Sequence, residues 1–423
     1  MIRSMFTAIS SLNLHQKYLD VVANNLANAN TTGFKASRVL FKDQFSQLMS
    51  PGSAPADTLG GTNPTQIGLG VGLGYVSGNF TQGTLQSTGR TMDLGVQGDG
   101  FFVYGKDAGR RYSREGSLNL DAQGYMVNMA SGLRVQGWLA GANGVDTNGP
   151  VDDIQIANDK TLAKATETVV FGGNLSADTV TDGTGSVTST MAVYDSLGAL
   201  QSATVMFTRT AADPLVWDWE VVDPSTGLAD PAFGVGDGTI TFDSNGQVDA
   251  TLTPNPVVNT PVQIPGSAGS ANTELIDLTL NLSEMTMLTS GNSVTVTSQD
   301  GLPAGTVSDV YISPNDGNIS LVYSNGMIEE VGQLALARFT NPAGLLGGEG
   351  TSFLAGLNSG EPEIGAASTG GRGLVASGYL EASNVDMAQE FTNMILAQRG
   401  FQASSRVITT SDEMLQELVN LKR

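Results

Sequence analysis

The chain has 423 residues, and 20 Lys and Arg against 41 Asp and Glu give it a formal net charge of −21. This charge argues against nucleic acid and anionic membrane surfaces as partners, because both need cationic counter-charge. The chain has no cysteine, which excludes disulfides and thiolate chemistry. No run of 18 apolar residues occurs, so we expect no membrane insertion.

The N-terminal segment predicts a helix over about residues 3–28. Its apolar residues recur at a spacing of three and four, which is typical of a helix that packs on another helix. They are Ile2, Met5, Ile9, Leu12, Leu19, Ala23 and Leu26. Asn28, Asn30 and Gly33 tolerate the left-handed conformation and predict the end of the helix. The segment is amphipathic and lacks a continuous apolar core, so it does not resemble a cleavable signal peptide.

Residues 34–75 predict an irregular connecting segment that contains three prolines and glycines at positions 68, 70, 72 and 74. These glycines do not fit the G-x-G-x-x-G register of a dinucleotide site, and no helix pattern follows them. We interpret them as an extended strand with close backbone contacts.

The middle of the chain predicts short strands separated by turns. Turn sequences occur at 121–124, 130–132, 195–198 and 243–246, and Asn325-Gly326 between two apolar runs is the strongest hairpin signal. The order of the segments predicts a discontinuous β domain from 76–148 and 292–370. An outer β domain from 149–291 is inserted into it.

The C-terminal segment predicts a second helix that begins near Asn384, after a connecting segment at 371–383. Its stripe comprises Phe391, Met394, Phe401, Ile408, Leu415 and Val419. No long helix is predicted between the two ends, so residues 1–33 and 384–423 must pack on each other or on the ends of other copies. The predicted fold is therefore multidomain, with nested all-β domains between terminal helices that pair as a coiled-coil-like bundle. A chain of this kind is typical of a polymer subunit.

The sequence gives no pattern for catalysis, a cofactor or a metal. His15 is the one histidine, so no Ser-His-Asp set and no histidine-rich metal site can form. We expect it at the surface or in the helix seam. Trp138, Trp217 and Trp219 fit the core of β domains better than a sugar-stacking surface. We therefore predict a protein that is not an enzyme.

Several stretches resemble the signatures of the bacterial flagellar rod and hook protein family. They lie at residues 23–35, 98–102, 380–387, 398–403 and 412–416, and so include both ends of the chain. The motif residues at the ends are Asn24, Asn25, Leu26, Asn28, Thr32, Gly33, Phe34, Asn384, Val385, Asp386, Gln398 and Arg399. Within the family, the chain length and the large insertion are similar to the hook type.

The resemblance implies a structural subunit that assembles with copies of itself into a curved hollow helical tube. Such a tube acts as a flexible universal joint that transmits torque from rod to filament. The implied partners are the distal rod protein, a hook-cap protein, a hook–filament junction protein and the flagellar type III export apparatus. The implied location is outside the cell, in the flagellum.

Two alternatives remain open from the sequence. A distal rod subunit would share the terminal segments and form straight, stiff assemblies. A secreted β-rich adhesin would use its middle domains and its tryptophans to hold a ligand. Curved hollow tubes in electron micrographs of the concentrated protein would favour the hook type, and straight assemblies would favour the rod subunit. Ligand binding by the isolated 149–291 fragment would favour the adhesin.

Overall fold

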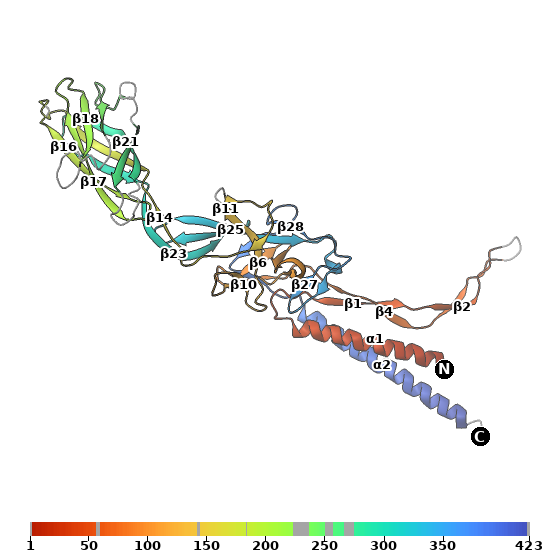
Figure 1. The fold of residues 1–423 in the computed structure, drawn as a ribbon. Coiled ribbons are helices and arrows are strands. Elements are labelled where there is room, and N and C mark those ends of the chain that lie inside the picture. Colours follow the sequence, from red (N-terminus) through yellow and green to blue (C-terminus); the bar gives the residue numbers. More distant parts are fainter. Residues whose placement is uncertain are drawn as a thin grey trace. The chain divides into compact units, whose positions relative to one another are not determined.

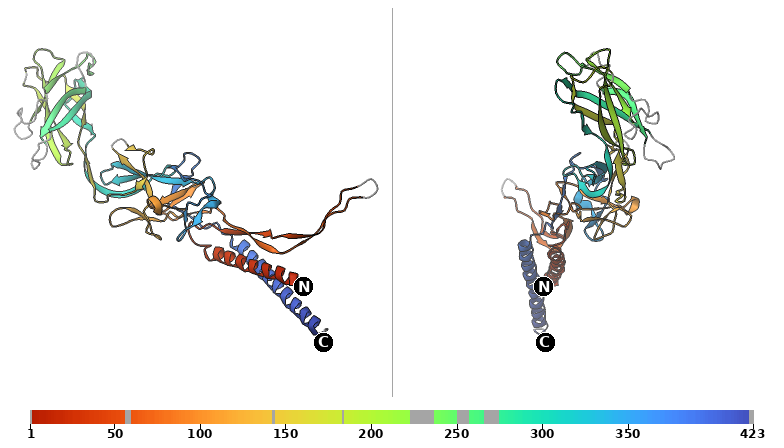
Figure 2. Two further views of the ribbon diagram at one scale, coloured as in Figure 1. Left: turned by 45° about the vertical axis from the view of Figure 1, so that its right-hand side comes forward. Right: turned by 90° about the vertical axis from the view of Figure 1, so that its left-hand side faces the viewer.

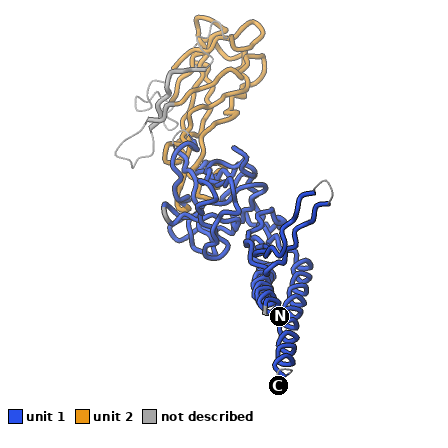
Figure 3. Tube along the Cα trace, turned by 90° about the vertical axis from the view of Figure 1, so that its right-hand side faces the viewer, with its two compact units in different colours: residues 1–157, 310–321, 329–423 blue, residues 158–309, 322–328 orange. Residues whose placement is uncertain are grey.

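The computed structural model describes residues 2–55, 60–141, 144–182, 184–222, 237–249, 257–265 and 275–420. The chain divides into two compact units (Figure 3). Unit 1 comprises Met1–Ala157, Val310–Leu321 and Glu329–Arg423, and unit 2 comprises Asn158–Asp309 and Val322–Ile328. The unit boundary therefore falls at Asn158 and Asp309, whereas the predicted insertion runs from 149 to 291.

Both terminal helices are present, and the middle of the chain is rich in β-strands. Helix α1 spans Ile2–Ala27 and helix α2 spans Met387–Asn420. The carboxylate of Asp386 caps α2, because its Oδ1 accepts hydrogen bonds from the backbone N–H of Ala388 and Gln389. The two helices lie side by side (Figures 1 and 2) and are antiparallel, with Ser11 opposite Ser404.

Residues 37–78 form a long antiparallel hairpin, and not the irregular connection that the sequence predicted. Strand β1 (Ser37–Asp43) pairs with β4 (Val71–Gly78), and β2 (Ser46–Ser50) pairs with β3 (Thr65–Gly68). The prolines lie in the far part of the hairpin, beyond β2 and before β3. Gly74 is extended and closely approached, as expected, because a Cβ there would lie 2.8 Å from the carbonyl oxygen of Leu40. Gly70 instead has a φ of +133° between β3 and β4, and an added Cβ on Gly68 or Gly72 would have no atom closer than 3.4 Å.

The rest of unit 1 is a β domain built from both halves of the chain. Its main sheet has the order β24-β25-β7-β8-β27-β26, and β11 and β28 also pair with β25. Phe101, Trp138 and Phe339 lie in its core, where the Phe101 and Phe339 ring centroids are 5.9 Å apart. The strands that lie wholly in unit 1 are β5 (Leu85–Ser87), β6 (Leu94–Gln97), β7 (Phe101–Tyr104), β8 (Arg111–Ser113), β9 (Leu118–Leu120), β10 (Met126–Asn128), β11 (Gln136–Gly141), β12 (Gly144–Val145), β13 (Asp152–Asp153), β26 (Leu346–Gly347), β27 (Ser352–Leu354), β28 (Glu363–Ala366), β29 (Leu374–Ser377) and β30 (Tyr379–Glu381). Two short 3-10 helices, η1 (Asp107–Gly109) and η3 (Pro342–Gly344), complete this unit among the described residues.

Unit 2 contains two four-stranded sheets, β20-β21-β15-β22 and β16-β17-β18-β19. Their inner faces contribute to one core, in which the rings of Phe171 and Phe207 are 6.1 Å apart and Trp217 is fully buried. The strands are β14 (Thr161–Lys164), β15 (Thr168–Ser176), β16 (Ser186–Tyr194), β17 (Leu200–Arg209), β18 (Val216–Val222), β19 (Asp237–Thr241), β20 (Val257–Pro265), β21 (Leu275–Leu288) and β22 (Thr295–Gln299). Strands β23 (Leu302–Ile312), β24 (Asn318–Tyr323) and β25 (Ile328–Arg338) carry residues of both units.

The predicted turns are present. Gly326 has a φ of +85° between β24 and β25, and its N–H donates to the carbonyl of Tyr323 at 3.0 Å. Gly124, Gly132, Gly198 and Gly246 also have positive φ angles at the ends of their predicted turns. The short-range signals identified these positions because only glycine adopts such angles without strain.

Gly33 gives a test of the segment that follows α1. Its φ is +69°, and a Cβ there would lie 2.6 Å from the backbone nitrogen of Glu115. We predict that Gly33→Ala lowers the free energy of unfolding of unit 1 by about 2 kcal/mol or more, because strain and a backbone clash add. Hydrogen exchange of the unit 1 strands during urea unfolding measures the change.

Gly350→Ala is the matched control, because Gly350 has a φ of +64° and no atom within 4 Å of an added Cβ. It should cost only about 1–2 kcal/mol, from strain alone. Equal losses in the two variants would mean that the close approach at Gly33 has no energetic weight.

Candidate assembly interface

A buried ionic cluster joins the inner ends of the two helices to the β domain. The Lys35 Nζ donates to Glu381 Oε1 at 2.6 Å, and Arg114 Nη1 donates to Glu381 Oε2 at 3.4 Å. The three side chains are at most 3% exposed. The backbone N–H of Gly83 also donates to Glu381 Oε1, and that of Gly33 donates to the Glu381 carbonyl, both at 2.8 Å. Glu381 therefore binds three segments that are far apart in the sequence, at 33–35, 83 and 114.

Two motif asparagines complete this junction. Asn25 at the end of α1 bonds in both directions with the backbone of Ser37, donating at 2.8 Å and accepting at 2.9 Å. Asn384 before α2 accepts from the N–H of Ala36 at 2.8 Å and donates to the carbonyls of Asn79 and Thr81. Both amides satisfy backbone groups that have no strand partner, and they fix the chain as it leaves each helix.

Burial sets the electrostatics of the cluster. It lowers the pKa of Lys35, while the hydrogen bond and charge of Glu381 oppose that change. Burial likewise lowers the pKa of Arg114, against the opposing charge of Glu381. A buried cation of this kind is tolerated because an anion compensates it, so the cluster depends on Glu381.

Small and polar side chains form the seam between α1 and α2. Ala397, Ser404 and Ser411 are buried and follow each other at intervals of seven residues. Ser404 Oγ donates to Ser11 Oγ at 3.0 Å. A Cβ on Gly400 would lie 2.5 Å from the imidazole of His15, so this glycine admits the ring. Burial lowers the pKa of His15, and the histidine is half-buried in the seam, as the sequence predicted.

The predicted stripe residues lie beside the seam or away from it. On α1 the buried residues are Ala8, Leu14, Val22 and Asn25, whereas Met5, Leu12, Leu19 and Leu26 are half-buried and Ile9 is exposed. On α2, Met394, Phe401, Ile408 and Leu415 are half-buried and alternate with the small residues, and Phe391 and Val419 are exposed. The side chain of Ile2 lies outside the described residues. The role of the stripe in polymerisation stays a prediction.

The motif residues fall into three groups. Asn25, Gly33, Asn384 and Asp386 hold the junction, as described above. Asn24 and Asn28 form a local bond at the end of α1, and Thr32 Oγ1 donates to Glu115 Oε1 at 3.4 Å. Leu26, Phe34 and Val385 are half-buried, while Gln398 and Arg399 are exposed on α2. No pattern in the sequence predicted the pairing of Glu381 with Arg114. The seven-residue spacing of Ala397, Ser404 and Ser411 could have predicted the buried face of α2.

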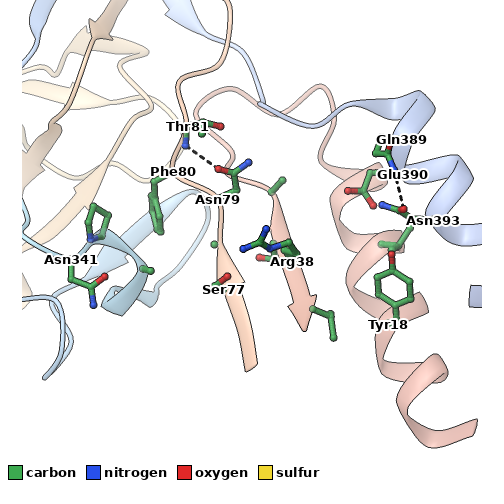
Figure 4. A pocket seen from close by; sticks show the side chains of 17 residues that line it. Tyr18, Arg38, Ser77, Asn79, Phe80, Thr81, Asn341, Gln389, Glu390 and Asn393 are labelled. Atoms are coloured by element: carbon green, nitrogen blue, oxygen red, sulfur yellow. Dashed lines mark hydrogen bonds between the residues drawn. The ribbon is translucent and has the colours of Figure 1, made fainter. Parts of the chain in front are cut away.

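A pocket of about 760 Å³ with both polar and apolar lining lies between the helices and the first hairpin (Figure 4). Tyr18 and Glu390 line it from the helices, Arg38 and Ser77 from the strands, and Asn341 from the turn at η3. Glu390 Oε1 accepts a hydrogen bond from Asn25 Nδ2 at 3.2 Å. Burial and, to a smaller extent, the nearby charge of Glu390 raise the pKa of Tyr18.

No catalytic constellation accompanies these features in the described part of the chain. Within it, no group of three or more His, Cys, Asp or Glu residues is placed to hold a metal ion. No described helix is long and apolar enough to cross a membrane. The three tryptophans are at most 4% exposed, so they form core and offer no stacking surface. The fold and the interface define a structural protein with paired terminal helices and β domains between them.

Comparison with known proteins identifies the family. Residues 5–35 match the family described as flagella basal body rod protein, and residues 376–421 match the flagellar basal body rod FlgEFG protein C-terminal family. Residues 95–173 match the flagellar hook protein FlgE/F/G D1 domain, and residues 158–302 match the flagellar basal body protein FlaE D2 domain.

Relatives align over the whole chain. The flagellar hook protein FlgE of Borreliella burgdorferi is 36% identical, with 100% of both chains covered, and that of Treponema pallidum is 35% identical with the same coverage. The flagellar basal-body rod protein FlgG of Bacillus subtilis is 29% identical over 100% of both chains. The crystal structure of the Helicobacter pylori flagellar hook protein FlgE2 aligns with a TM-score of 0.47 and 15% identity, over 70% of this chain and 100% of that chain. The chain belongs to the flagellar hook protein family and is a structural subunit of the hook.

The Glu381 cluster yields a prediction. Glu381→Gln leaves the Lys35 and Arg114 charges buried without a counter-charge, so we expect unit 1 to lose roughly 3–5 kcal/mol of its free energy of unfolding. Urea unfolding followed by hydrogen exchange of the unit 1 strands measures the loss.

Glu349→Gln is the control, because Glu349 pairs with Arg111 at 3.2 Å but its side chain is 84% exposed. This surface pair should contribute less than about 1 kcal/mol. A Glu381→Gln variant as stable as Glu349→Gln would show that the buried cluster does not hold the junction.

Proposed function

We propose that copies of this chain polymerise through their terminal helices into a curved hollow tube, the flexible joint between rod and filament. The observation that carries this proposal is the set of large apolar side chains on the outer face of the helix pair. Ile395 is 53% exposed, Leu396 is 60% exposed and Val419 is 69% exposed. Apolar surface of this size on a helix favours contact with another chain.

The helix seam supports the same conclusion. Small residues of α2 occupy the centre of its contact with α1, and most of the large stripe side chains are only half-buried within one copy, so part of their apolar surface remains for neighbours. Burying one such side chain contributes roughly 1.5–3 kcal/mol. Several neighbours around each helix pair would therefore add coiled-coil-like contacts that a single copy lacks.

The length of α2 also favours contacts between copies. Helix α2 has 34 residues and α1 has 26. Ser404 lies opposite Ser11, so the last turns of α2 extend beyond the start of α1. Met414, Leu418 and Val419 in these turns are exposed. These side chains would become buried if another chain packed on the last turns of α2, or if α2 bent toward its own chain.

The hairpin offers a second surface for neighbouring copies. Phe45 is 78% exposed, and Leu48, Met49 and Ile67 are also exposed. Strands β2 and β3 are exposed along their whole length, and a two-stranded ribbon without a covered face is marginally stable in water. We infer that neighbouring copies cover this hairpin in the tube.

The proposed partners are those expected of a subunit located between rod and filament. They are further copies of this chain, the distal rod protein, a hook-cap protein, a hook–filament junction protein and the flagellar type III export apparatus. Export would proceed through that apparatus, to the part of the flagellum outside the cell. No cofactor, nucleic acid or membrane insertion is involved in this proposal.

Unit 2 belongs, in this proposal, to the outer layer of the tube and tunes its bending. It carries its own core and is joined to unit 1 through strands β23, β24 and β25 and the chain at Asn158. A distal rod subunit is the second candidate, favoured by the full-length similarity to the Bacillus subtilis rod protein. Straight tubes under all conditions would support that candidate.

The apolar face gives the main test. We predict that Ile395→Ser combined with Leu396→Ser prevents tube formation and leaves the monomer folded, because these side chains become buried only in the assembly. Sedimentation and electron microscopy measure assembly, and circular dichroism measures folding.

Leu346→Ser is the matched control, because Leu346 is 58% exposed but lies in the β domain of unit 1. Tubes should form normally from this variant. Normal tubes from the α2 double variant would contradict the proposed role of the helices.

The structure also defines a clean removal of the insertion. Gly301 lies directly against the side chain of Thr166, so the two segments of the chain are adjacent there. A short Gly-Ser bridge can therefore replace residues 167–300. We predict that this variant assembles into tubes with altered curvature, because the polymerising helices are intact. Electron microscopy measures the curvature. If unit 1 of this variant is folded and the variant still forms no tubes, the insertion is needed for polymerisation.

A further inference from the structure

The pocket beside the helices contains an anionic atom with no partner. Glu390 is half-buried, and its Oε1 accepts from Asn25 Nδ2 at 3.2 Å. Its Oε2 is buried and has no hydrogen-bond partner among the described residues. A buried carboxylate oxygen without a partner costs free energy, so this geometry favours a donor that arrives from outside.

Arg399 is a cation without a partner on the same helix. It is exposed and makes no ion pair or hydrogen bond with the described residues. Nine residues separate it from Glu390, about 13 Å along the helix axis, so the two cannot pair within one copy. The side chains one turn before it, Ile395 and Leu396, are exposed and apolar. If a neighbouring copy covers them, Arg399 is desolvated as well and needs an anion.

We infer that Arg399 of one copy enters this pocket of a neighbouring copy and pairs with Glu390. The inference rests on the proposed self-assembly and adds a specific charged contact to it. The volume of about 760 Å³ is ample for a guanidinium, and Tyr18, Ser77 and Asn79 supply a polar lining around it (Figure 4). The contact joins two different surfaces of identical chains. Such contacts generate an open helical assembly whenever the rotation from copy to copy does not close into a ring.

Two other cations need to be distinguished from Arg399. Arg38 lines the same pocket from β1 and could reach Glu390 if the pocket closed. Arg406 is also exposed on α2, but the residues one turn before it are Gln402 and Ala403, so no large apolar side chain surrounds it there. Arg399 is therefore the cation whose surroundings become most buried on assembly.

The test measures the critical concentration for tube formation by the full chain. Glu390→Gln and Arg399→Gln should each raise it on the order of tenfold, the effect of losing one charged hydrogen bond. The two changes combined should cost little more than either one, and the charge exchange Glu390→Arg with Arg399→Glu should restore assembly at least in part. Circular dichroism and thermal melting should show folded monomers throughout.

Arg406→Gln is the matched control and should leave the critical concentration unchanged. Normal assembly of Arg399→Gln, strictly additive effects of the two changes, or an Arg38→Gln variant that behaves like Glu390→Gln would overturn the inference. These outcomes are distinct from failure of the proposed function, in which the unaltered chain itself forms no tubes.

Because the chain has no cysteine, a second measurement is available. Glu390→Cys protein mixed with Arg399→Cys protein should form dimers with a short bismaleimide cross-linker under assembly conditions. A mixture of Glu390→Cys and Arg406→Cys should do so far less. Equal cross-linking in both mixtures would contradict a specific contact at Arg399.

Discussion

Glu381 is the residue on which the connection between helices and β domain depends. Its two carboxylate oxygens and its carbonyl accept hydrogen bonds from Lys35, Gly83, Arg114 and Gly33, which come from three separate segments. The side chain is fully buried, so each bond forms in a medium of low polarity and is correspondingly strong. A load applied to either helix therefore reaches the β domain through bonded atoms, which suits a subunit that transmits torque.

The helix pair divides its residues between two tasks. Ala397, Gly400 and Ser404 allow α1 and α2 to approach closely, and large apolar side chains remain on the outer surface. A seam of large residues would have stabilised the single copy further and left less apolar surface for neighbours. In the proposed assembly, contacts between copies would add to the stability of these helices.

Several elements could be predicted from sequence because their causes are local. The glycine turns such as Gly326, and the left-handed turn at Gly33 that follows the end of α1 at Ala27, depend on the conformational preferences of single residues. Asp386 is likewise a residue type that favours a helix start. The hairpin at 37–78 was missed because its strands pair across many residues and carry little alternation. On α1 the buried residues differ from the predicted stripe, because the prediction assigned the helix contact to large apolar side chains at one spacing.

The sequence by itself determined the two amphipathic terminal helices, the β-rich middle and the absence of thiol chemistry, because composition and short-range periodicity fix these properties. Only the tertiary structure decided that Glu381 meets Lys35 and Arg114, since these residues lie 346 and 267 positions from it in the chain. It also decided that Glu390 keeps one buried oxygen unpaired and that Arg399 faces outward. Pairing over such separations depends on how the strands and helices pack, and no local preference in the sequence records it.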